Sequence, residues 1–430
     1  MSSTGSHFEK KNIGIIGLGY VGLPLAILIA EAGYKVFGFD LQENVCKILN
    51  SGESHIKDIS STRVKDVVQN NLFIATKNFE LLEECDVISI CVPTPLNKMK
   101  DPDLSYVISA TEEIKKFLKK GQLIILESTT FPGTTRQLLL PILESSGLKV
   151  GNDFYLCFSP ERVDPGNELW NTKNTPKLIG GVTEKCKQLG TEFYSFVFDK
   201  IITVSNTEIA ELVKVYENTF RMINIALANE LSIICDKLNL DVWEVIDAAS
   251  TKPFGFMKFT PGPGLGGHCI PLDPHYLTWK LRTLDYNIEI IDLASEINSK
   301  MPLYIVNKIG ESLNNIYKSF KGSKILIMGI AYKKDIDDIR ESPALDIIIY
   351  LQKRGANVYF HDPHCPTIIN DGHVDIQNLP MNSVSLTDDF VKEMDLVAII
   401  TDHSSIDYNI ISNNAKIIID TRGVFKKNIL

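Results

Sequence analysis

The N-terminal part of the chain alternates short apolar runs with turns and a helical stretch. Residues 12–16 form an apolar run that leads into the turn Gly17-Leu-Gly-Tyr-Val-Gly22, and residues 24–32 then follow a helical pattern. A second apolar run, residues 35–39, ends at Asp40. Short apolar runs bounded by turn residues are typical of buried parallel strands. The order strand, glycine turn, helix, strand and acid predicts the first unit of a doubly wound α/β sheet.

Two more apolar runs, residues 86–92 and 122–126, predict further strands of the same sheet. Thr94 follows the first of them, and Thr129 and Thr130 follow the second. In such a sheet the residues that follow the strand ends line the ligand crevice. We therefore expect Thr94 and Thr129 to lie near a bound ligand.

The C-terminal third of the chain repeats this pattern. The paired segments are 12–17 with 324–329, 35–40 with 357–362, 85–91 with 394–400, and 122–126 with 415–420. The repeat, with a helix expected over residues 343–354, predicts a second doubly wound lobe. This lobe lacks the glycine fingerprint and carries the segment from Tyr332 to Arg340 in its place. We therefore expect it to hold a different phosphate ligand, gripped by side chains.

Between the two lobes, residues 208–238 place apolar side chains at three- and four-residue spacing, which predicts one long helix. Its length exceeds what one domain usually needs and favours a spine between lobes or a dimer interface. Lys214, Asn218 and Arg221 share one face of this helix, which is either a solvated polar face or part of a binding site.

Composition and charge bound the class of protein. A chain of 430 residues with 44% hydrophobic and 23% charged residues is expected to form two or three ordinary globular domains. The net charge of −9 offers no basic patch for nucleic acid. No apolar run is long enough to cross a bilayer and the N-terminus lacks the layout of a signal peptide, so we expect a cytoplasmic location with no membrane partner.

Cysteine and histidine usage adds little to this picture. The eight cysteines contain no CxxC pair, so free thiols in a reducing compartment are expected. The run His361-Asp-Pro-His364-Cys365 has metal-ligand residue types, but the end of a strand and its turn explain it, and structural zinc sites normally use two spaced ligand pairs. We therefore expect no metal.

The glycine turn carries the cofactor prediction. Its glycines allow close approach of a pyrophosphate, the following helix offers free N–H groups, and Asp40 is placed to bind a ribose diol. An acid at that position would repel a 2′-phosphate, so the expected cofactor is NAD and not NADP.

A second chemical motif is the Gly/Pro-rich stretch from Thr260 to Asp273. It places the thiol of Cys269 in a loop, four residues before a carboxylate. Most free cysteines are buried small hydrophobes, whereas catalytic thiols lie in polar loops near bases or carboxylates. Cys269 is thus either structural or a nucleophile.

Taken together, these motifs resemble the UDP-glucose/GDP-mannose dehydrogenase family over residues 11–425. The resemblance rests on the fingerprint at Gly17, Ser159-Pro-Glu161, Lys214-x-x-x-Asn218, the Gly-Gly-His-Cys loop ending at Asp273, and Tyr332-Lys333 with Asp338-x-Arg340. It implies two Rossmann-like doubly wound domains joined by a long central helix that makes a homodimer or a higher oligomer. The implied domains are NAD-binding (8–204), helical and dimer-forming (205–318) and UDP-binding (319–430).

The resemblance also implies an activity: oxidation of the C6 alcohol of a nucleotide sugar to a carboxylate with two NAD⁺, for surface polysaccharide precursors. Cys269 would attack the C6 aldehyde, and the hemithioacetal would become a thioester that water hydrolyses. Lys214 and Asn218 would hold the reacting oxygen or its water, Asp273 would tune the thiol and the water, and Glu161 would align water or substrate. Thr129 would position the hydrolytic water, with Thr130 as the alternative.

Binding roles follow in the same way. The implied cofactor residues are Gly17, Gly19, Tyr20, Val21, Gly22, Asp40, Thr94, Thr129 and Arg340. The implied substrate residues are Glu161, Arg162, Lys214, Asn218, Arg221, Phe259, Gly266, Tyr332, Lys333 and Arg422.

The sugar is suggested by two departures from the glucose-oxidising members. Arg162 stands where those members carry an aromatic residue, and the loop at 261–274 is most similar to the branch acting on 2-acetamido sugars, in particular UDP-N-acetylglucosamine 6-dehydrogenases. UDP-N-acetylglucosamine is therefore the expected substrate, with UDP-glucose, UDP-N-acetylmannosamine and UDP-N-acetylgalactosamine as alternatives. His268 either activates the thiol or packs. A two-electron dehydrogenase without a covalent step and a non-catalytic NAD sensor are the competing functions.

Overall fold

A computed structural model describes residues 11–57, 59–97, 101–164, 167, 169–267, 270–369 and 375–425. The chain forms two compact units. The first contains the described residues up to Glu217 together with His275–Tyr286, and the second contains the described parts of Asn218–Pro274 and of Asn287–Leu430. The two units are described separately below.

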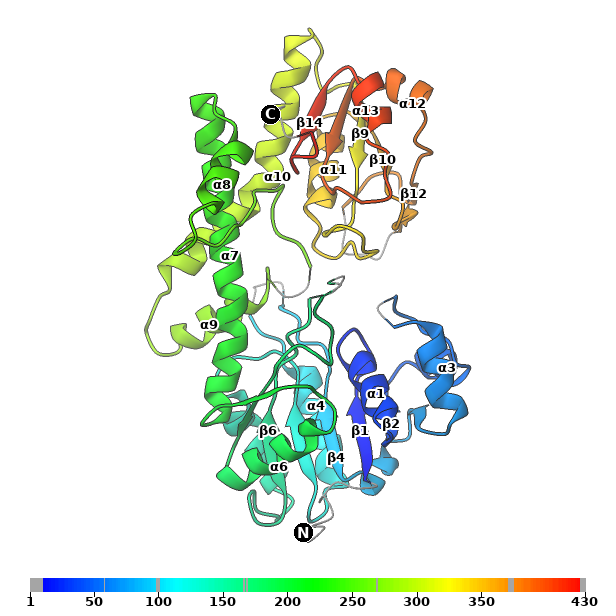
Figure 1. Ribbon diagram of the computed structural model, residues 1–430, viewed down its shortest axis with the longest axis vertical. Coiled ribbons are helices and arrows are strands. Elements are labelled where there is room, and N and C mark those ends of the chain that lie inside the picture. Colours follow the sequence, from blue (N-terminus) through cyan, green and yellow to red (C-terminus); the bar gives the residue numbers. More distant parts are fainter. Residues whose placement is uncertain are drawn as a thin grey trace. The chain divides into compact units, whose positions relative to one another are not determined.

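The first unit is built on an eight-stranded sheet with the order β3-β2-β1-β4-β5-β6-β7-β8 (Figure 1). Its strands are β1 (Asn12–Ile16), β2 (Lys35–Phe39), β3 (Phe73–Thr76), β4 (Val87–Ile90), β5 (Leu123–Leu126), β6 (Tyr155–Phe158), β7 (Lys177–Gly181) and β8 (Ile201–Thr203). Its helices are α1 (Gly22–Glu31), α2 (Glu43–Asn50), α3 (Ser61–Gln69), α4 (Ser105–Lys116), α5 (Leu140–Glu144) and α6 (Glu184–Ser195), with short turns of helix at Phe79–Glu84 and Thr135–Leu139.

Continuous apolar strands explain this sheet. Strands β4, β5 and β6 are buried along their whole length, as expected where helices cover both faces of a parallel sheet. Strands β1 to β6 are parallel, whereas β7 runs antiparallel to β6. The reversal at β7 brings the beginning of that strand to the edge where the preceding strands end.

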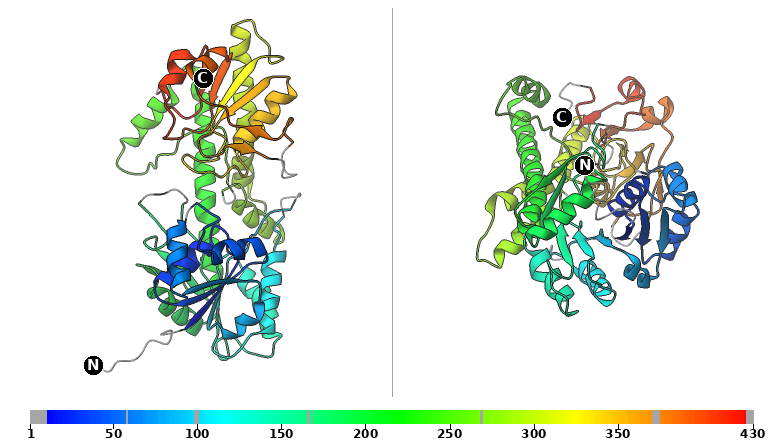
Figure 2. Two further views of the ribbon diagram at one scale, coloured as in Figure 1. Left: turned by 90° about the vertical axis from the view of Figure 1, so that its right-hand side faces the viewer. Right: turned by 60° about the horizontal axis from the view of Figure 1, so that its bottom comes forward.

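The second unit contains a four-stranded parallel sheet with the order β10-β9-β13-β14. The left view of Figure 2 shows this part of the chain in yellow to red. Its strands are β9 (Lys324–Met328), β10 (Asn357–His361), β13 (Leu396–Ile399) and β14 (Ile418–Asp420), with a separate pair β11 (Thr367–Ile368) and β12 (Met381–Asn382). Its helices are α8 (Val242–Ser250), α10 (Glu289–Asn315), α11 (Pro343–Lys353), α12 (Asp388–Glu393) and α13 (Asn409–Asn414). Helices α7 (Thr207–Leu238) and α9 (Asp273–Arg282) contribute residues to both units.

The predicted repeat is confirmed by topology. The order β2-β1-β4-β5 in the first sheet corresponds to β10-β9-β13-β14 in the second. The turns after β1 and β9 also match, because the Gly17 N–H donates to Phe39 O and the Gly329 N–H donates to His361 O, both at 2.8 Å. The predicted α/β class with two doubly wound lobes and a long helix is therefore confirmed.

None of the helices in the described part of the chain is long and apolar enough to cross a membrane.

Candidate active site

The glycine turn after β1 has the shape of a pyrophosphate cradle. Gly17 has a φ of +90°, and a Cβ placed there would lie 2.7 Å from the carbonyl oxygen of Cys91. A Cβ at Gly22 would lie 1.8 Å from Gly17 O, whereas one at Gly19 would meet no described atom within 4 Å. A side chain at Gly17 or Gly22 would therefore collide with the protein's own backbone. Gly19 leaves open space in front of the N-terminus of α1, where an anion is favoured.

Asp40 lies at the end of β2 and is partly exposed. Its Oδ2 accepts a hydrogen bond from Leu18 N (3.0 Å) and its Oδ1 accepts one from Gln42 N (2.9 Å). Each carboxylate oxygen has room for a second donor. The carboxylate is thus held in place with acceptor capacity to spare, and the residues fit the ribose diol of NAD.

The remaining cofactor predictions lie around this turn or at neighbouring strand ends. Tyr20 is 38% exposed beside the turn, and Val21 directly precedes α1. Thr94 O accepts a hydrogen bond from the Tyr276 hydroxyl (2.7 Å), which fixes the segment that follows β4. Arg340 belongs to the second unit, where its guanidinium pairs with Asp338, with Nη2 2.6 Å from Oδ2.

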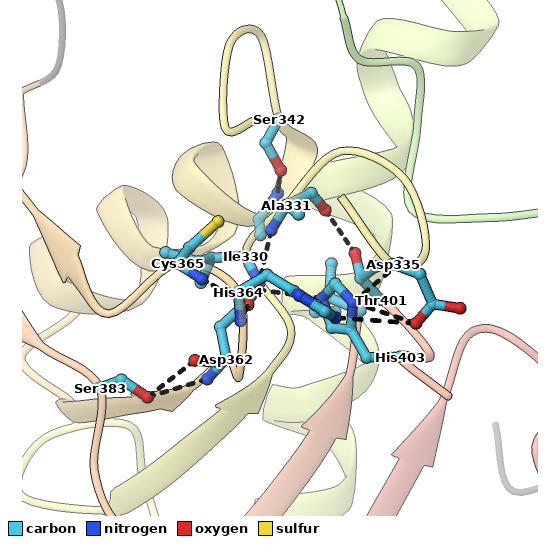
Figure 3. A network of polar contacts seen from close by, with 12 residues as sticks. Ile330, Ala331, Asp335, Ser342, Asp362, His364, Cys365, Ser383, Thr401 and His403 are labelled. Carbon is cyan, nitrogen blue, oxygen red and sulfur yellow. Dashed lines mark hydrogen bonds and ion pairs between the residues drawn. The ribbon is translucent and has the colours of Figure 1, made fainter. Parts of the chain in front are cut away.

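In the second lobe, Asp362 takes the place of Asp40 and is used differently (Figure 3). Its Oδ2 accepts from Ile330 N (2.7 Å) and Ala331 N (3.1 Å) and lies 3.0 Å from His403 Nε2. Its Oδ1 accepts from the backbone N–H groups that follow it, at positions 364 and 365. These donors hold the pKa of the Asp362 carboxyl well below its usual range despite burial. The acid therefore secures the turn before Tyr332.

His403 completes this network. Its Nδ1 accepts a hydrogen bond from Asp335 N (3.0 Å), so in neutral His403 the proton is on Nε2, where it is donated to Asp362. His364 Nε2 lies 3.8 Å from Asp335 Oδ1, and these three side chains place nitrogen and oxygen atoms within 4.8 Å of one another. A cation bound there would have to displace the Asp335 N–H from His403. We therefore assign no metal to this group.

Tyr332 packs against the Gly/Pro-rich loop. A Cβ on Gly267, whose φ is +83°, would lie 2.9 Å from the Tyr332 ring, and one on Gly266 would lie 2.5 Å from Tyr332 Cβ. The Gly267 N–H also donates to Arg340 O (3.0 Å). The two glycines thus let the Tyr332 segment approach the loop that leads to Cys269.

Arg422 lies against the same loop. Its Nη1 is 2.8 Å from a Cβ placed on Gly262, and its Nε donates to Ile400 O (2.7 Å). Burial lowers its pKa, an effect that the nearby Asp402 and Asp420 oppose. The structure therefore brings Tyr332, Arg422 and the loop together. Phe259, which begins the loop, stacks edge-on against Phe220 at 5.9 Å between ring centroids.

On α7, Lys214 is 9% exposed, and no described residue accepts a hydrogen bond from it or pairs with it. The side chain is thus largely buried, while its ammonium group stays available to a ligand or to water. One turn further on, the amide of Asn218 donates to Asp273 Oδ2. Arg221 is exposed on the same helix.

Glu161 and Arg162 follow β6. Glu161 Oε1 accepts from Arg162 N (2.8 Å) and Val163 N (2.9 Å). The Arg162 guanidinium donates to Glu217 from Nε (3.2 Å) and Nη2 (2.5 Å), and to Pro176 O from Nη1 (3.0 Å). Arg162 would have to exchange some of these bonds to contact a sugar.

Sequence reasoning missed Lys177, a charged residue beside Glu161. Lys177, 3% exposed, pairs with the fully buried side chain of Glu127 at 2.6 Å and lies 3.6 Å from Glu161. The sequence did carry a signal for this pair: Glu127 directly follows the apolar strand β5, and Lys177 is the first residue of the strand β7.

Thr129 and Thr130 differ in accessibility. Thr129 is partly exposed, whereas Thr130 is fully buried and its Oγ1 has no hydrogen-bond partner among the described residues.

Cys269 and His268 lie outside the described residues. The other seven cysteines are free and buried. Burial raises the pKa of Cys85 to about 12 and raises the pKa values of Cys91 and Cys157 well above the ordinary thiol value. These three thiols are therefore poor nucleophiles.

Comparison with known proteins places the whole chain in one family. Three domains of the UDP-glucose/GDP-mannose dehydrogenase family match: the NAD binding domain over residues 11–198, the central domain over 208–300 and the UDP binding domain over 326–427.

Individual relatives agree. UDP-N-acetyl-D-mannosamine dehydrogenase of Pyrococcus horikoshii is 36% identical over 422 residues, covering 96% of each chain. UDP-N-acetyl-D-glucosamine 6-dehydrogenase of Pseudomonas aeruginosa is 36% identical over 359 residues, covering 82% of each.

Solved structures of relatives have the same fold. The UDP-D-ManNAc dehydrogenase structure from Pyrococcus horikoshii matches with a TM-score of 0.86 at 35% identity, covering 97% of this chain and 96% of the other. The UDP-N-acetyl-mannosamine dehydrogenase of Staphylococcus aureus matches with a TM-score of 0.82 at 34% identity and the same coverage. The chain therefore belongs to the UDP-glucose/GDP-mannose dehydrogenase family and is an NAD-dependent nucleotide-sugar dehydrogenase.

Proposed function

We propose that this enzyme oxidises the C6 alcohol of a UDP-N-acetylhexosamine to the uronic acid. One sugar and one water would be converted with two NAD⁺ into one carboxylate, two NADH and protons. The observation that carries the proposal is Lys214, whose side chain is mostly buried while its ammonium group has no acceptor among the described residues. An alcohol oxygen that becomes an aldehyde oxygen and then an oxyanion would supply that acceptor.

When bound, NAD accepts the hydride that leaves C6 in each of the two oxidations. The chain supplies the remaining chemistry. The Cys269 thiolate adds to the C6 aldehyde, which forms a C–S bond and a hemithioacetal; loss of hydride from this adduct gives a thioester. Water then adds to the thioester carbonyl, the C–S bond breaks, and the thiol is restored.

Asn218 and Asp273 would act on the oxygen and the water of these steps. Their hydrogen bond fixes the Asn218 amide, so its oxygen and its second N–H have defined directions. Glu161, with one carboxylate oxygen held by two backbone N–H groups, would align the water.

The second lobe would hold the UDP part of the substrate. Tyr332 and Lys333 follow the turn that Asp362 secures, and Arg422 lies against the Gly/Pro-rich loop at Gly262. Lys and Arg side chains would then bind the diphosphate, whereas in the first lobe the backbone N–H groups of the glycine turn would do so.

Support for a 2-acetamido sugar comes from the relatives. The names of similar proteins include UDP-N-acetyl-D-mannosamine and UDP-N-acetyl-D-glucosamine dehydrogenases. UDP-N-acetylglucosamine, expected from the loop sequence, and its C2 epimer UDP-N-acetylmannosamine are therefore the first substrates to compare. Arg162 is proposed to select the sugar through a change in its bonds to Glu217 and Pro176.

The decisive experiment measures NADH release with UDP-glucose, UDP-GlcNAc, UDP-GalNAc and UDP-ManNAc as separate substrates. We expect two NADH per sugar, with a 2-acetamido sugar giving the highest kcat/KM. One NADH per sugar, with an aldehyde product, would reject the four-electron reaction. UDP-glucose as the best substrate would reject the 2-acetamido specificity.

A Cys269→Ala variant tests the covalent step. We expect it to bind the UDP-sugar but to form no uronate, while Cys269→Ser accumulates a slowly hydrolysed ester. Uronate production by Cys269→Ala at a rate near that of the wild-type enzyme would return this thiol to a structural role.

A further inference from the structure

A buried group of charges lies beside Glu161 in the first unit. It consists of Glu127, which follows β5, Glu161, which follows β6, Lys177, which begins β7, and Tyr194 on α6. The side chain of Glu127 is 0% exposed, that of Lys177 is 3% exposed and that of Glu161 is 18% exposed. Glu161 is thus the only carboxylate of this group with measurable access to solvent.

Strand direction explains why Lys177 is present at this edge. Strand β7 runs antiparallel to β6, with Phe158 opposite Gly180 and Cys157 opposite Gly181. Continued by three residues, this register sets position 161 opposite position 177. A parallel strand would have put its first residue at the other edge of the sheet.

Lys177 contacts both carboxylates and the backbone between them. Its Nζ donates to Glu127 Oε2 (2.6 Å) and to Pro160 O (3.3 Å) and lies 3.6 Å from Glu161 Oε2. The rings of Tyr194 and Phe198 flank the ammonium group at 5.4 and 5.2 Å from their centroids. The Tyr194 hydroxyl donates to the other oxygen of Glu127. Glu127 and Tyr194 thus hold Lys177 in one position.

The carboxylate of Glu161 is constrained from two sides. Its Oε1 accepts the two backbone N–H groups of Arg162 and Val163, and its Oε2 faces the Lys177 ammonium. Glu127 alone would satisfy the charge of Lys177. The approach to Glu161 and the hydrogen bond to Pro160 are therefore extra contacts, and both bear on the residue that the proposed function uses to align water.

We propose that Lys177 is a positioning residue that holds the Glu161 carboxylate in the orientation needed to align the hydrolytic water. This inference rests on the proposed function. Glu127 and Tyr194 contribute indirectly: Glu127 accepts from Lys177, and Tyr194 donates to Glu127. Lys177 itself is buried behind Glu161 and does not need to touch the substrate.

The test separates positioning from charge neutralisation. Lys177→Met alone leaves Glu127 buried without its cation, a change that can prevent folding. The variant Glu127→Gln/Lys177→Met removes both charges at nearly constant volume. Glu127→Gln alone is the matched control, because the Gln side-chain oxygen can still accept from Lys177 Nζ and so keeps Lys177 beside Glu161. Activity is measured as kcat and KM for the UDP-sugar, and intact-protein mass spectrometry follows the acyl adduct on Cys269.

We expect the double variant to lose at least about tenfold in kcat, which is less than the roughly 100- to 10,000-fold that a positioned acid–base group itself contributes, with KM within about twofold of wild type. It should accumulate the acyl adduct, and adding Glu161→Gln should cause no further loss. Glu127→Gln should keep most of kcat. Wild-type kcat in the double variant, or an equal loss in Glu127→Gln, would overturn the proposal.

Failure of the proposed function has a different signature. If the wild-type enzyme releases one NADH per sugar and forms no uronate, the proposed function itself is wrong. If the wild-type enzyme forms uronate and the double variant does so equally fast, only the positioning role of Lys177 is wrong.

Discussion

The side-chain amide of Asn218 donates a 2.5 Å hydrogen bond to the carboxylate of Asp273, which lies 55 positions further along the chain. Both residues belong to the second unit, and Asp273 is 4% exposed at the beginning of α9. Two residues assigned from separate motifs are therefore one hydrogen-bonded pair.

This pairing makes the two residues energetically coupled. Asp273→Ala should lower kcat about 10- to 1000-fold with a small change in KM, because the Asn218 amide loses its acceptor and its orientation. The loss in Asn218→Ala/Asp273→Ala should be smaller than the product of the two single losses. Kinetics of all three variants check this. Strictly multiplicative losses would show that the residues act independently.

Cofactor choice should depend on Asp40. Wild-type enzyme should prefer NAD strongly over NADP, since the Asp40 carboxylate would repel the 2′-phosphate of a cofactor bound in the glycine turn. Asp40→Ala should lower the ratio of kcat/KM with NAD to kcat/KM with NADP at least about tenfold, which corresponds to about 1.4 kcal/mol. Gln42→Ala serves as the control. This variant keeps the Asp40 carboxylate and the backbone N–H of position 42 that donates to it. Equal use of both cofactors by the wild-type enzyme would contradict the prediction.

The two neighbouring threonines should behave differently. Thr129→Val should slow thioester hydrolysis, because Thr129 is the more accessible of the two. Thr130→Val should leave kcat nearly unchanged and should not destabilise the protein, since it replaces a buried hydroxyl that has no partner among the described residues. Single-turnover kinetics and thermal unfolding give the two readouts. The opposite pattern would assign the water to Thr130.

Stability should carry a pH signature from Glu211. This carboxyl accepts from Thr135 N (2.8 Å) and Gly133 N (2.5 Å), yet burial raises its pKa from 4.5 to about 7. The folded state therefore retains a proton that the unfolded state releases above about pH 4.5. The free energy of unfolding should fall by up to about 3 kcal/mol from this group as pH rises from 4.5 to 7, and the loss should be complete above that range.

Glu211→Gln removes the titration and should flatten this part of the profile. Denaturant unfolding at several pH values, compared between wild type and variant, measures the difference. Parallel profiles would show that Glu211 titrates normally in the folded protein.

Helix α7 should mediate self-association. One face of it carries large apolar side chains that are 40% or more exposed, namely Ile209, Leu212, Tyr216, Phe220, Leu227, Ile234 and Leu238. An apolar stripe of this length on one helix is typical of an interface. Leu227→Glu should shift the protein from dimer to monomer in sedimentation, while the polar exposed Glu230→Ala should not. An active wild-type monomer would reject the prediction.

Sequence patterns located four strands of each large sheet, because these parallel strands are short, apolar and bounded by turn residues. The expected run 324–329 became β9 and the expected helix 343–354 became α11. Helix α10 was not predicted, because Pro302 lies within it and proline normally ends a helix. Buried residues such as Ile305 and Ile309, which belong to the core of the second lobe, hold that helix together. The direction of β7, and with it the place of Lys177, depends on tertiary pairing that no local pattern records.

The saturation of Asp362 has a consequence for sorting two similar ligands. NAD and UDP-sugars both contain a ribose attached to a diphosphate. A lobe of this fold that carries an unoccupied carboxylate after its second strand could therefore bind either ligand. Four backbone N–H groups and His403 occupy Asp362, whereas Asp40 meets only two backbone donors. Because main-chain donors and His403 already occupy the Asp362 carboxylate, it has no acceptor left for the ribose diol of NAD. Two lobes of the same fold can therefore bind different ligands, with NAD in the first and the UDP-sugar in the second.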